Sequence, residues 1–472
     1  MIDGLRPYAE MKPTGLPWLG EVPVHWDVRR NGRLFSARRE TNFPKLPILE
    51  VSIRTGVRIR DFDNNGRKQE MTDRSKYQRA VKGDIAYNMM RMWQGAVGIA
   101  PVDGLVSPAY VVARPFAETD TAYYAYLFRT AAYMREIDVF SRGIVPDRNR
   151  LYWESFKQMP SVYPPIEEQR LIVRFLNWHG GQVARLVRAK KKLIALLNEQ
   201  KQAIIHHAVT RGLDPDAKLK PSGIPWLGDV PEGWEVKRLK TICRINPPRS
   251  SGRMADAEEL VTFLPMEKVG VDGKIDGSIR MPISQMASGF TCFQRNDVIL
   301  AKITPCFENG KGAVLDALPT PIGFGSTEFI VLRASNALDP RFLYLLTFEA
   351  QFRRLGEESM TGSAGQQRIS REFVANYPVA VPCRDEQVRI AEGLSVATSD
   401  VDATIDTAER EIALIQEFRT RLIADVVTGN LDVRTIAASL PETDDFEVAD
   451  DPSEDENLDD MADDTEDEEA AA

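Results

Sequence analysis

Residues 12–26 read KPTGLPWLGEVPVHW, and residues 220–234 read KPSGIPWLGDVPEGW. When residue 12 is aligned with residue 220, 12 of the 19 positions up to residues 30 and 238 are identical. A repeat of this length within one chain indicates an internal duplication, which decides the architecture before any local motif does. We call each copy the PWLG segment.

A second repeat follows each PWLG segment after about 150 residues. PPIEEQRLIVRFL at 164–176 corresponds to VPCRDEQVRIAEGL at 381–394, and residues 193–214 match residues 411–432 at a constant offset of 218. Apolar side chains in these stretches recur in alternating steps of four and three, which predicts two long helices that pack on each other. We expect the Glu167-Glu168 and Asp385-Glu386 pairs to favour the helix N-termini through the helix dipole, and Gly180-Gly181 to kink the first helix. The residues that we predict to form the packing and docking seam are Ile172, Leu176, Val183, Leu186, Leu193, Leu197, Ile390, Leu394, Val401, Ile405, Ile412 and Ile415.

The blocks between these repeats alternate short apolar runs with Gly, Pro and Asp turns, and each block ends in one short helical stretch. This pattern predicts an α+β domain in each half. We therefore expect two related mixed α/β domains separated by an antiparallel pair of long coiled-coil helices, with unlike loops on a shared scaffold. The expected division is a first domain at 1–165, a central helix at 166–211, a second domain at 212–383, a distal helix at 384–430 and an acidic tail at 431–472.

The net charge of −9 hides a strong asymmetry along the chain. Residues 441–472 hold 17 of the 69 acidic residues and no Lys or Arg, so the remaining 440 residues carry 52 acidic against 60 basic residues, a net charge of +8. Such an acidic, apolar-poor tail is expected to be disordered, and the mildly basic body is compatible with a polyanionic partner. The sequence has no signal peptide pattern, no membrane-length apolar run and no CxxC pair, which favours a cytoplasmic protein with reduced thiols and no metal site.

Catalytic motifs are missing from the sequence. It has no phosphate-binding loop, no GxGxxG turn for a dinucleotide or S-adenosylmethionine, and no cluster of histidines with carboxylates. What remains is a set of basic and amide side chains in the loops of each block, of the types that neutralise phosphates and read base edges. A solvated basic surface explains any single one of them, so DNA binding is inferred from the whole set. The set comprises Arg54, Arg58, Arg60, Arg67, Lys68, Arg91, Gln94, Arg142, Arg148, Asn149, Arg150, Arg249, Arg253, Lys302, Lys311, Gln366, Gln367 and Arg368.

The PWLG segments, the block GDIAYNMMRMWQGAVGIAPVDGLVSPAYVVARP, the PPIEEQR helix start and their second copies resemble the specificity subunit of type I restriction–modification enzymes, over about residues 12–432. The resemblance implies two target recognition domains that each read one half of a split, asymmetric double-stranded DNA site. It also implies two methylation subunits docked on the long helices, and restriction subunits that translocate and cleave DNA. S-adenosylmethionine, ATP and Mg are then expected on those partners, with no cofactor or catalysis on this chain. The alternative is a DNA-binding or assembly protein that acts without restriction partners.

On this interpretation, residues 52–94 and 142–150 read one half-site, and residues 249–253, 302–311 and 362–371 read the other. The PWLG segments contain no acid, base or ligand set. Their Trp pairs, Trp18 and Trp26 with Trp226 and Trp234, offer large surfaces to bury. We therefore predict that each segment is a structural element at the start of one domain rather than a DNA contact.

Overall fold

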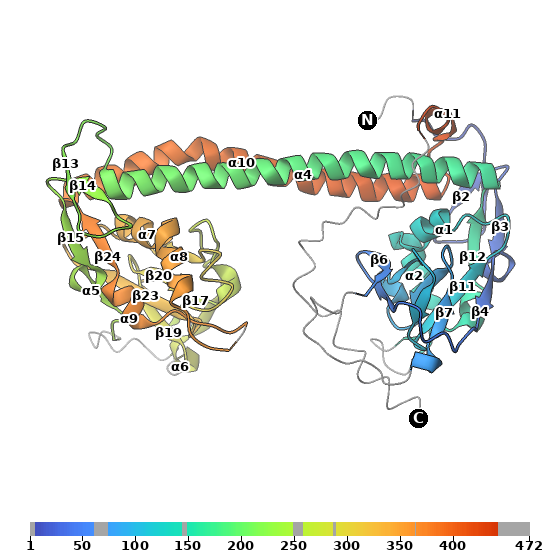
Figure 1. The fold of residues 1–472 in the computed structure, drawn as a ribbon, viewed down its shortest axis with the longest axis horizontal. Helices are drawn as coiled ribbons and strands as arrows, with labels where there is room; N and C mark the ends of the chain where they lie inside the picture. Colours follow the sequence, from blue (N-terminus) through green and yellow to red (C-terminus); the bar gives the residue numbers. More distant parts are fainter. Residues whose placement is uncertain are drawn as a thin grey trace. The chain divides into compact units, whose positions relative to one another are not determined.

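The computed structural model describes residues 5–60, 74–143, 149–248, 258–286, 289–363 and 365–441. The chain forms two compact units. Unit 1 contains residues 1–191 and 409–472, and unit 2 contains residues 192–408. Both units share the two longest helices, α4 (Ile166–Arg211) and α10 (Arg384–Val427), which run side by side (Figure 1). The expected α+β fold with two β-rich domains and two packed long helices is therefore confirmed.

The two long helices run antiparallel within each unit. In unit 1, the His179 ring lies 6.1 Å from the Phe418 ring, and Lys190 Nζ lies 2.5 Å from Glu411 Oε2. In unit 2, Lys201 Nζ lies 2.6 Å from Asp402 Oδ1, and Leu213 packs beside Gly393. Helix α4 remains helical through Gly180 and Gly181, so these glycines do not end it.

The centre of each unit is a four-stranded antiparallel sheet with the same strand order. In unit 1 the order is β4-β11-β8-β9, and in unit 2 it is β16-β23-β20-β21. The duplication seen in the sequence is therefore a duplication of one sheet. Unit 1 contains β1 (Met11–Pro13), β2 (Glu21–Pro23), β3 (Asp27–Arg30), η1 (Asn31–Arg33), β4 (Phe35–Arg38), β5 (Leu49–Ser52), β6 (Gly56–Ile59), η2 (Arg74–Lys76), β7 (Gln78–Ala80), β8 (Ile85–Asn88), η3 (Met92–Gln94), β9 (Val97–Ile99), β10 (Gly104–Val106), β11 (Tyr110–Pro115), α1 (Thr121–Phe128), α2 (Ala131–Phe140), α3 (Trp153–Phe156), β12 (Pro160–Tyr163) and α11 (Arg434–Ala438).

The units differ on the other side of this shared sheet. In the described part of unit 1, the additions are the two-stranded pairs β5-β6 and β7-β10, whereas unit 2 adds a second four-stranded sheet, β18-β17-β22-β19, in which β17 and β22 are parallel. Unit 2 contains β13 (Leu219–Pro221), β14 (Asp229–Pro231), β15 (Glu235–Arg238), α5 (Leu239–Ile242), β16 (Cys243–Ile245), β17 (Leu260–Leu264), η5 (Met266–Lys268), β18 (Arg280–Pro282), α6 (Ile283–Met286), β19 (Thr291–Gln294), β20 (Val298–Ala301), β21 (Gly312–Val314), β22 (Ile322–Gly325), β23 (Phe329–Ala334), α7 (Pro340–Phe348), α8 (Ala350–Glu358), α9 (Arg371–Asn376) and β24 (Pro378–Val381).

The helical stretch that ends each block is two helices, not the single one expected. In unit 1, α1 ends at Phe128, and the Thr130 hydroxyl accepts a hydrogen bond from Tyr133 N, which caps α2. Glu349 does the same in unit 2, where its carboxylate accepts from Phe352 N at the start of α8. A capping side chain satisfies a backbone N–H that has no partner within its helix, so the chain can turn at these points.

Each PWLG segment forms a small hairpin that leads to a buried tryptophan. The hairpins are β1-β2 and β13-β14, and they turn at Gly20 and Gly228, both with positive φ. Trp26 and Trp234 are 0% and 1% exposed. Their indole Nε1 atoms donate to Glu168 Oε1 at 3.0 Å and to Glu386 Oε1 at 3.1 Å. The acidic residue in the first turn of each long helix therefore holds the PWLG segment by a hydrogen bond, in addition to any effect on the helix dipole.

The glutamine that follows each of these glutamates connects the same helix turn to the next domain element. Gln169 Oε1 accepts from Asp120 N at 2.9 Å, and Gln387 Oε1 accepts from Asp339 N at 2.8 Å. Asp120 and Asp339 are the N-caps of α1 and α7. The repeated Glu-Gln pair thus fixes the first turn of α4 or α10 against both the PWLG segment and the helix behind the sheet.

Candidate DNA interface

The predicted DNA-contacting side chains of unit 1 lie on three neighbouring loops. Arg54 is exposed in the turn between β5 and β6, and Arg91 and Gln94 lie in the loop between β8 and β9. Arg142 and Arg150 face each other across a two-way backbone bridge, with both N–O distances 3.0 Å. Leu151 N donates to Met89 O at 2.8 Å, which places the bridge beside the β8–β9 loop.

Two arginines of the β5-β6 hairpin are engaged by one carboxylate. Arg58 Nε donates to Glu50 Oε1 at 2.5 Å, and Arg60 Nε lies 4.0 Å from Glu50 Oε2. Glu50 faces Arg58 across the hairpin because the two are register partners. Sequence reasoning missed Glu50, although the alternation LEVS directly opposite GVRI could have indicated the pairing. Asn149 is also engaged, since its Nδ2 donates to Asp138 Oδ1 at 3.2 Å.

Unit 2 repeats this arrangement with residues that are far apart in the sequence. Arg368 donates from Nε and Nη2 to the two carboxylate oxygens of Glu328, both at 3.0 Å. Lys302 Nζ lies 3.7 Å from Glu328 Oε2 and donates to Thr327 O at 2.9 Å. The hydrogen bonds from Arg368 lower the pKa of Glu328 below its usual range. Each unit therefore carries a cluster in which one carboxylate pairs with two predicted DNA-contacting cations.

The strand-like pairing of two segments brings the unit 2 loops together. Ile303 and Arg368 form an isolated bridge, Ile369 N donates to Lys302 O, and Gln367 N donates to Thr304 Oγ1. Gln366 is exposed beside them. Residues 302–311 and 362–371 were predicted to read the same half-site, and the structure brings residues 302–304 and 367–369 of these segments together.

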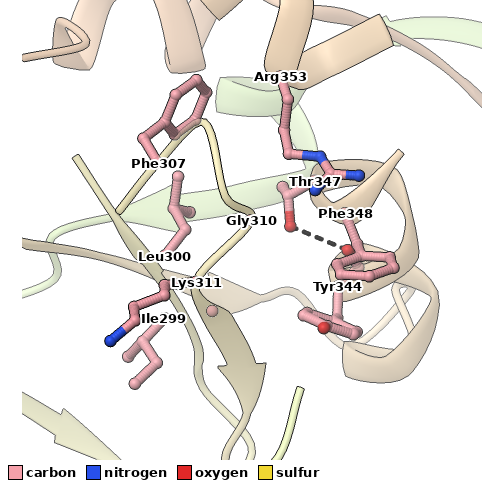
Figure 2. A pocket seen from close by; sticks show the side chains of 10 residues that line it. Ile299, Leu300, Phe307, Gly310, Lys311, Tyr344, Thr347, Phe348 and Arg353 are labelled. Carbon is pink, nitrogen blue, oxygen red and sulfur yellow. Dashed lines mark hydrogen bonds between the residues drawn. The ribbon is translucent and has the colours of Figure 1, made fainter. Parts of the chain in front are cut away.

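Lys311 occupies a different environment from the other predicted cations of unit 2. Its Nζ donates to Met266 O at 3.2 Å, and its side chain points away from Arg353 (Figure 2). The neighbouring Gly310 has a φ of +75°, and a Cβ there would lie 2.3 Å from Arg353 Nη1. Arg353 itself lies 5.0 Å from the centre of the Phe348 ring, and burial lowers its pKa. Gly310 therefore allows the turn that presents Lys311 to pass close to Arg353.

Five predicted contact residues lie outside the described part of the chain: Arg67, Lys68, Arg148, Arg249 and Arg253.

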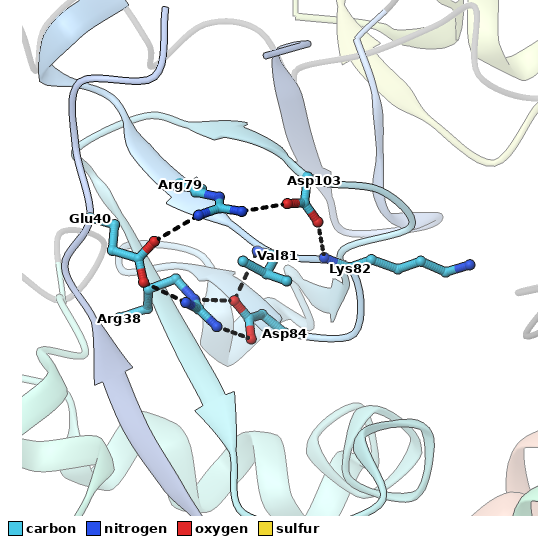
Figure 3. A network of polar contacts seen from close by, with 7 residues as sticks. All are labelled: Arg38, Glu40, Arg79, Val81, Lys82, Asp84 and Asp103. Carbon is cyan, nitrogen blue, oxygen red and sulfur yellow. Dashed lines mark hydrogen bonds and ion pairs between the residues drawn. The ribbon is translucent and has the colours of Figure 1, made fainter.

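A chain of charged residues in unit 1 was missed by sequence reasoning. Arg38 donates to Asp84 and to Glu40, and Arg79 donates to Glu40 at 3.1 Å and to Asp103 at 2.7 Å (Figure 3). Lys82 N also donates to Asp103. This network ties β4, β7 and the turns before β8 and β10 together.

The network has one direct counterpart in unit 2. Asp297, at the equivalent turn before β20, receives two hydrogen bonds of 2.7 Å from Arg333. Asp84 and Asp297 are 3% and 1% exposed. Burial of an aspartate at this turn is therefore a feature of the shared scaffold.

The residues of the predicted helix seam divide into buried ends and exposed middles. Ile172, Leu176, Ile390 and Leu394 are 3% exposed or less and belong to the cores of their units. Leu186 and Leu193, by contrast, are 47% and 43% exposed. The remaining six are half-buried: Val183, Leu197, Val401, Ile405, Ile412 and Ile415. Among these seam residues, the exposed apolar side chains, Leu186 and Leu193, lie in the middle of α4.

No helix within the described ranges is long and apolar enough to cross a membrane. Where side chains are described, no group of three or more His, Cys, Asp or Glu residues could hold a metal ion.

The two similar α+β domains and the pair of long helices define the class of protein: it is a duplicated two-domain scaffold. Residues 231–417 match the family model of the type I restriction modification DNA specificity domain. The matched segment therefore carries a type I restriction–modification DNA specificity domain.

Individual relatives agree with this assignment. The chain is 40% identical over 166 residues to the type I restriction enzyme EcoAI specificity subunit of Escherichia coli, which is 34% of this chain and 27% of that relative. It is 34% identical over 202 residues to the EcoEI specificity subunit of Escherichia coli, covering 42% of this chain and 33% of the relative. The matched regions therefore span a third or less of these two curated relatives.

One solved structure supports the fold over nearly the whole chain. It is described as "Structural basis underlying complex assembly and conformational transition of the type I R-M system", and one of its chains matches 87% of this chain and 99% of its own length. The TM-score is 0.59 at 16% sequence identity, so the likeness concerns the fold alone.

Proposed function

We propose that this chain supplies the DNA sequence specificity of a type I restriction–modification complex. It binds a split, asymmetric double-stranded target, with one half-site per domain, and performs no catalysis itself. The observation that carries this proposal is the duplicated sheet, β4-β11-β8-β9 and β16-β23-β20-β21, which presents unlike basic loops in the two units. Similar scaffolds with different loops suit two half-sites of different sequence.

The paired cations explain how such a surface can remain selective. Arg58 and Arg60 share Glu50, and Lys302 and Arg368 share Glu328. A DNA phosphate has to replace the carboxylate as the partner of each cation, which weakens binding to any sequence that offers backbone charge alone. Base contacts from neighbouring Gln94, Asn149, Gln366 and Gln367 then contribute the specific part of the affinity.

The long helices act as the docking frame for the partner subunits. Leu186, Leu193 and Leu196 on α4 and Leu414 on α10 are 43–63% exposed, and exposed apolar side chains along a helix mark a protein interaction surface. We assign this surface to two methylation subunits. Restriction subunits join the complex they form, and the partners hold S-adenosylmethionine, ATP and Mg.

A domain exchange tests the proposal. Residues 12–165 are replaced by the corresponding block of another family member, and the methylated DNA motif is determined by single-molecule sequencing. One half of the motif should change and the other half should remain. A change in both halves, or in neither, contradicts the assignment of one half-site to each domain.

A second experiment separates this function from that of a DNA-binding or assembly protein without restriction partners. The methylated motifs of the host are compared before and after deletion of the gene. Loss of one bipartite motif supports the proposed function, whereas an unchanged methylation pattern favours the alternative.

A further inference from the structure

The helix seam is filled by aromatic rings in unit 1. The Phe175 and His179 rings stack with their centres 6.0 Å apart, and the His179 and Phe418 rings lie 6.1 Å apart. Phe175 is fully buried and His179 is 9% exposed. Together with Phe418, which is 43% exposed, these rings occupy the seam between α4 and α10 in this unit.

The equivalent positions of unit 2 carry no aromatic side chain. At the offset of 218 residues, Phe175 corresponds to Gly393, His179 to Ala397 and Phe418 to Gln200. These three residues line an open groove of about 410 Å³. The remaining lining residues are Ala203, Ile204, His207, Ala208, Gly212, Leu213 and Leu394. Unit 2 therefore has the same helix pair as unit 1 but lacks the aromatic side chains that occupy the seam of unit 1.

The lining of the groove restricts what it can bind. It contains no Asp, Glu, Lys or Arg, so a charged group or a DNA phosphate would lose its hydration without gaining a partner. Two apolar side chains at or next to the groove are strongly exposed, Leu213 at 51% and Val396 at 77%. An apolar groove with exposed apolar neighbours on a helix pair is typical of a protein interaction site.

We propose that this groove binds an aromatic side chain presented by a methylation subunit docked on α4 and α10. The inference rests on the proposed function, which places that partner on these helices. The ring chemistry follows from unit 1, where aromatic rings occupy the equivalent seam, and from a lining without Asp, Glu, Lys or Arg. The seam of unit 1 is already occupied by its own rings. Two copies of the methylation subunit therefore meet different sites on this chain, and only the copy at unit 2 inserts an aromatic ring.

Filling the groove from within tests the proposal. Gly393→Phe and Ala397→Phe are made separately, so that each places a ring in the groove. The space exists for the first, because a Cβ on Gly393 meets only the flexible end of Leu213, 2.9 Å from Cδ1. Ser395→Phe adds the same ring two residues along the helix, at an exposed position outside the groove lining, and serves as the matched control.

The readout is the binding of the methylation subunit of the same system to the full chain, measured as stoichiometry by native mass spectrometry and as affinity by sedimentation. Thermal melts show which variants are folded. The test uses the binding data of the groove variants that fold. We expect the groove variants to bind one methylation subunit about tenfold or more weaker than the wild type. The control and the wild type should bind two.

Two other results overturn the inference in distinguishable ways. Groove variants that bind both subunits with wild-type affinity exclude the groove as a binding site while leaving the proposed function intact. A wild-type chain that binds no methylation subunit overturns the docking function itself, and with it the partner named for the groove.

Discussion

At the residue scale, the first turn of each long helix carries more of the fold than its sequence suggests. Glu168 lies 6% exposed and accepts hydrogen bonds from Tyr8 Oη at 2.5 Å and from Trp26. Charge at a helix N-terminus led us to expect a dipole effect, which requires no particular partner. Only the repeat itself, in which Trp and Glu recur together, could have indicated that the two side chains meet.

Substitution of the two neighbouring glutamates separates these roles. Glu167→Ala removes an exposed charge from the same helix turn, whereas Glu168→Ala leaves the Trp26 and Tyr8 donors buried without their acceptor. We expect Glu168→Ala to lower the free energy of unfolding by about 1–3 kcal/mol more than Glu167→Ala. Urea denaturation measures both, and equal losses would mean that the helix dipole dominates.

The pH dependence of unit 2 has a contribution from His206. Its Nδ1 lies 2.9 Å from Glu349 Oε1, and this hydrogen bond raises the pKa of His206 above its usual value. A raised pKa in the folded state stabilises the protein below about pH 6.5, and the contribution is lost as the pH rises through the folded pKa. His206→Ala should therefore reduce the melting temperature at pH 6 and have a smaller effect at pH 8. A difference that does not change with pH would show that the histidine contributes only by packing.

At the scale of elements, the long helices and the strands of the central sheets could be predicted because their apolar periods are local. The breaks at Thr130 and Glu349 could not, since each stretch looks like one continuous helix in the sequence and a single capping side chain decides the turn. The same limit applies to the basic loops. Lys302, Glu328 and Arg368 meet only because two segments more than 60 residues apart pair at Ile303 and Arg368.

The carboxylate of unit 2 provides a test at this scale. Glu328→Gln should release Lys302 and Arg368 from their shared partner and strengthen DNA binding. The slope of log affinity against log salt concentration should become steeper by an amount that corresponds to about one to two additional phosphate contacts. Glu372→Gln makes the same charge change on the exposed surface of α9 and corrects for net charge. DNA titrations at several salt concentrations measure both. Identical slopes would indicate that the two cations do not contact phosphates.

At the scale of the whole molecule, the repeat predicted two domains on one scaffold but not the second sheet of unit 2. That sheet pairs β17 with β22, which are about 60 residues apart, in a parallel register that no local turn specifies. The described residues of unit 1 form no corresponding sheet with which to compare it. The second sheet of unit 2, where the two domains differ most, is therefore the part of the fold that the sequence did not predict.

The acidic segment at the C-terminus leads to a prediction from charge alone. Residues 442–472 lie outside the described part of the chain, and their removal takes away 17 negative charges and leaves a basic chain. If the segment competes with DNA for the basic loops, the shortened chain should bind DNA more tightly at low salt and equally at high salt, because salt screens the competition. Affinities that match the full chain at both salt concentrations would exclude competition.

The division of the chain between the units also sets an order of synthesis. Unit 2 is built from one continuous stretch, residues 192–408, whereas unit 1 needs residues 409 and beyond. Its core includes Val426 and Val427, and Tyr123 Oη donates to Val427 O at 2.7 Å. At roughly 5–20 residues per second, a ribosome that has finished residue 191 needs at least about 10 s to supply these partners. The half that is made first is therefore completed last, and until then the Phe175 face of α4 has no cover from α10.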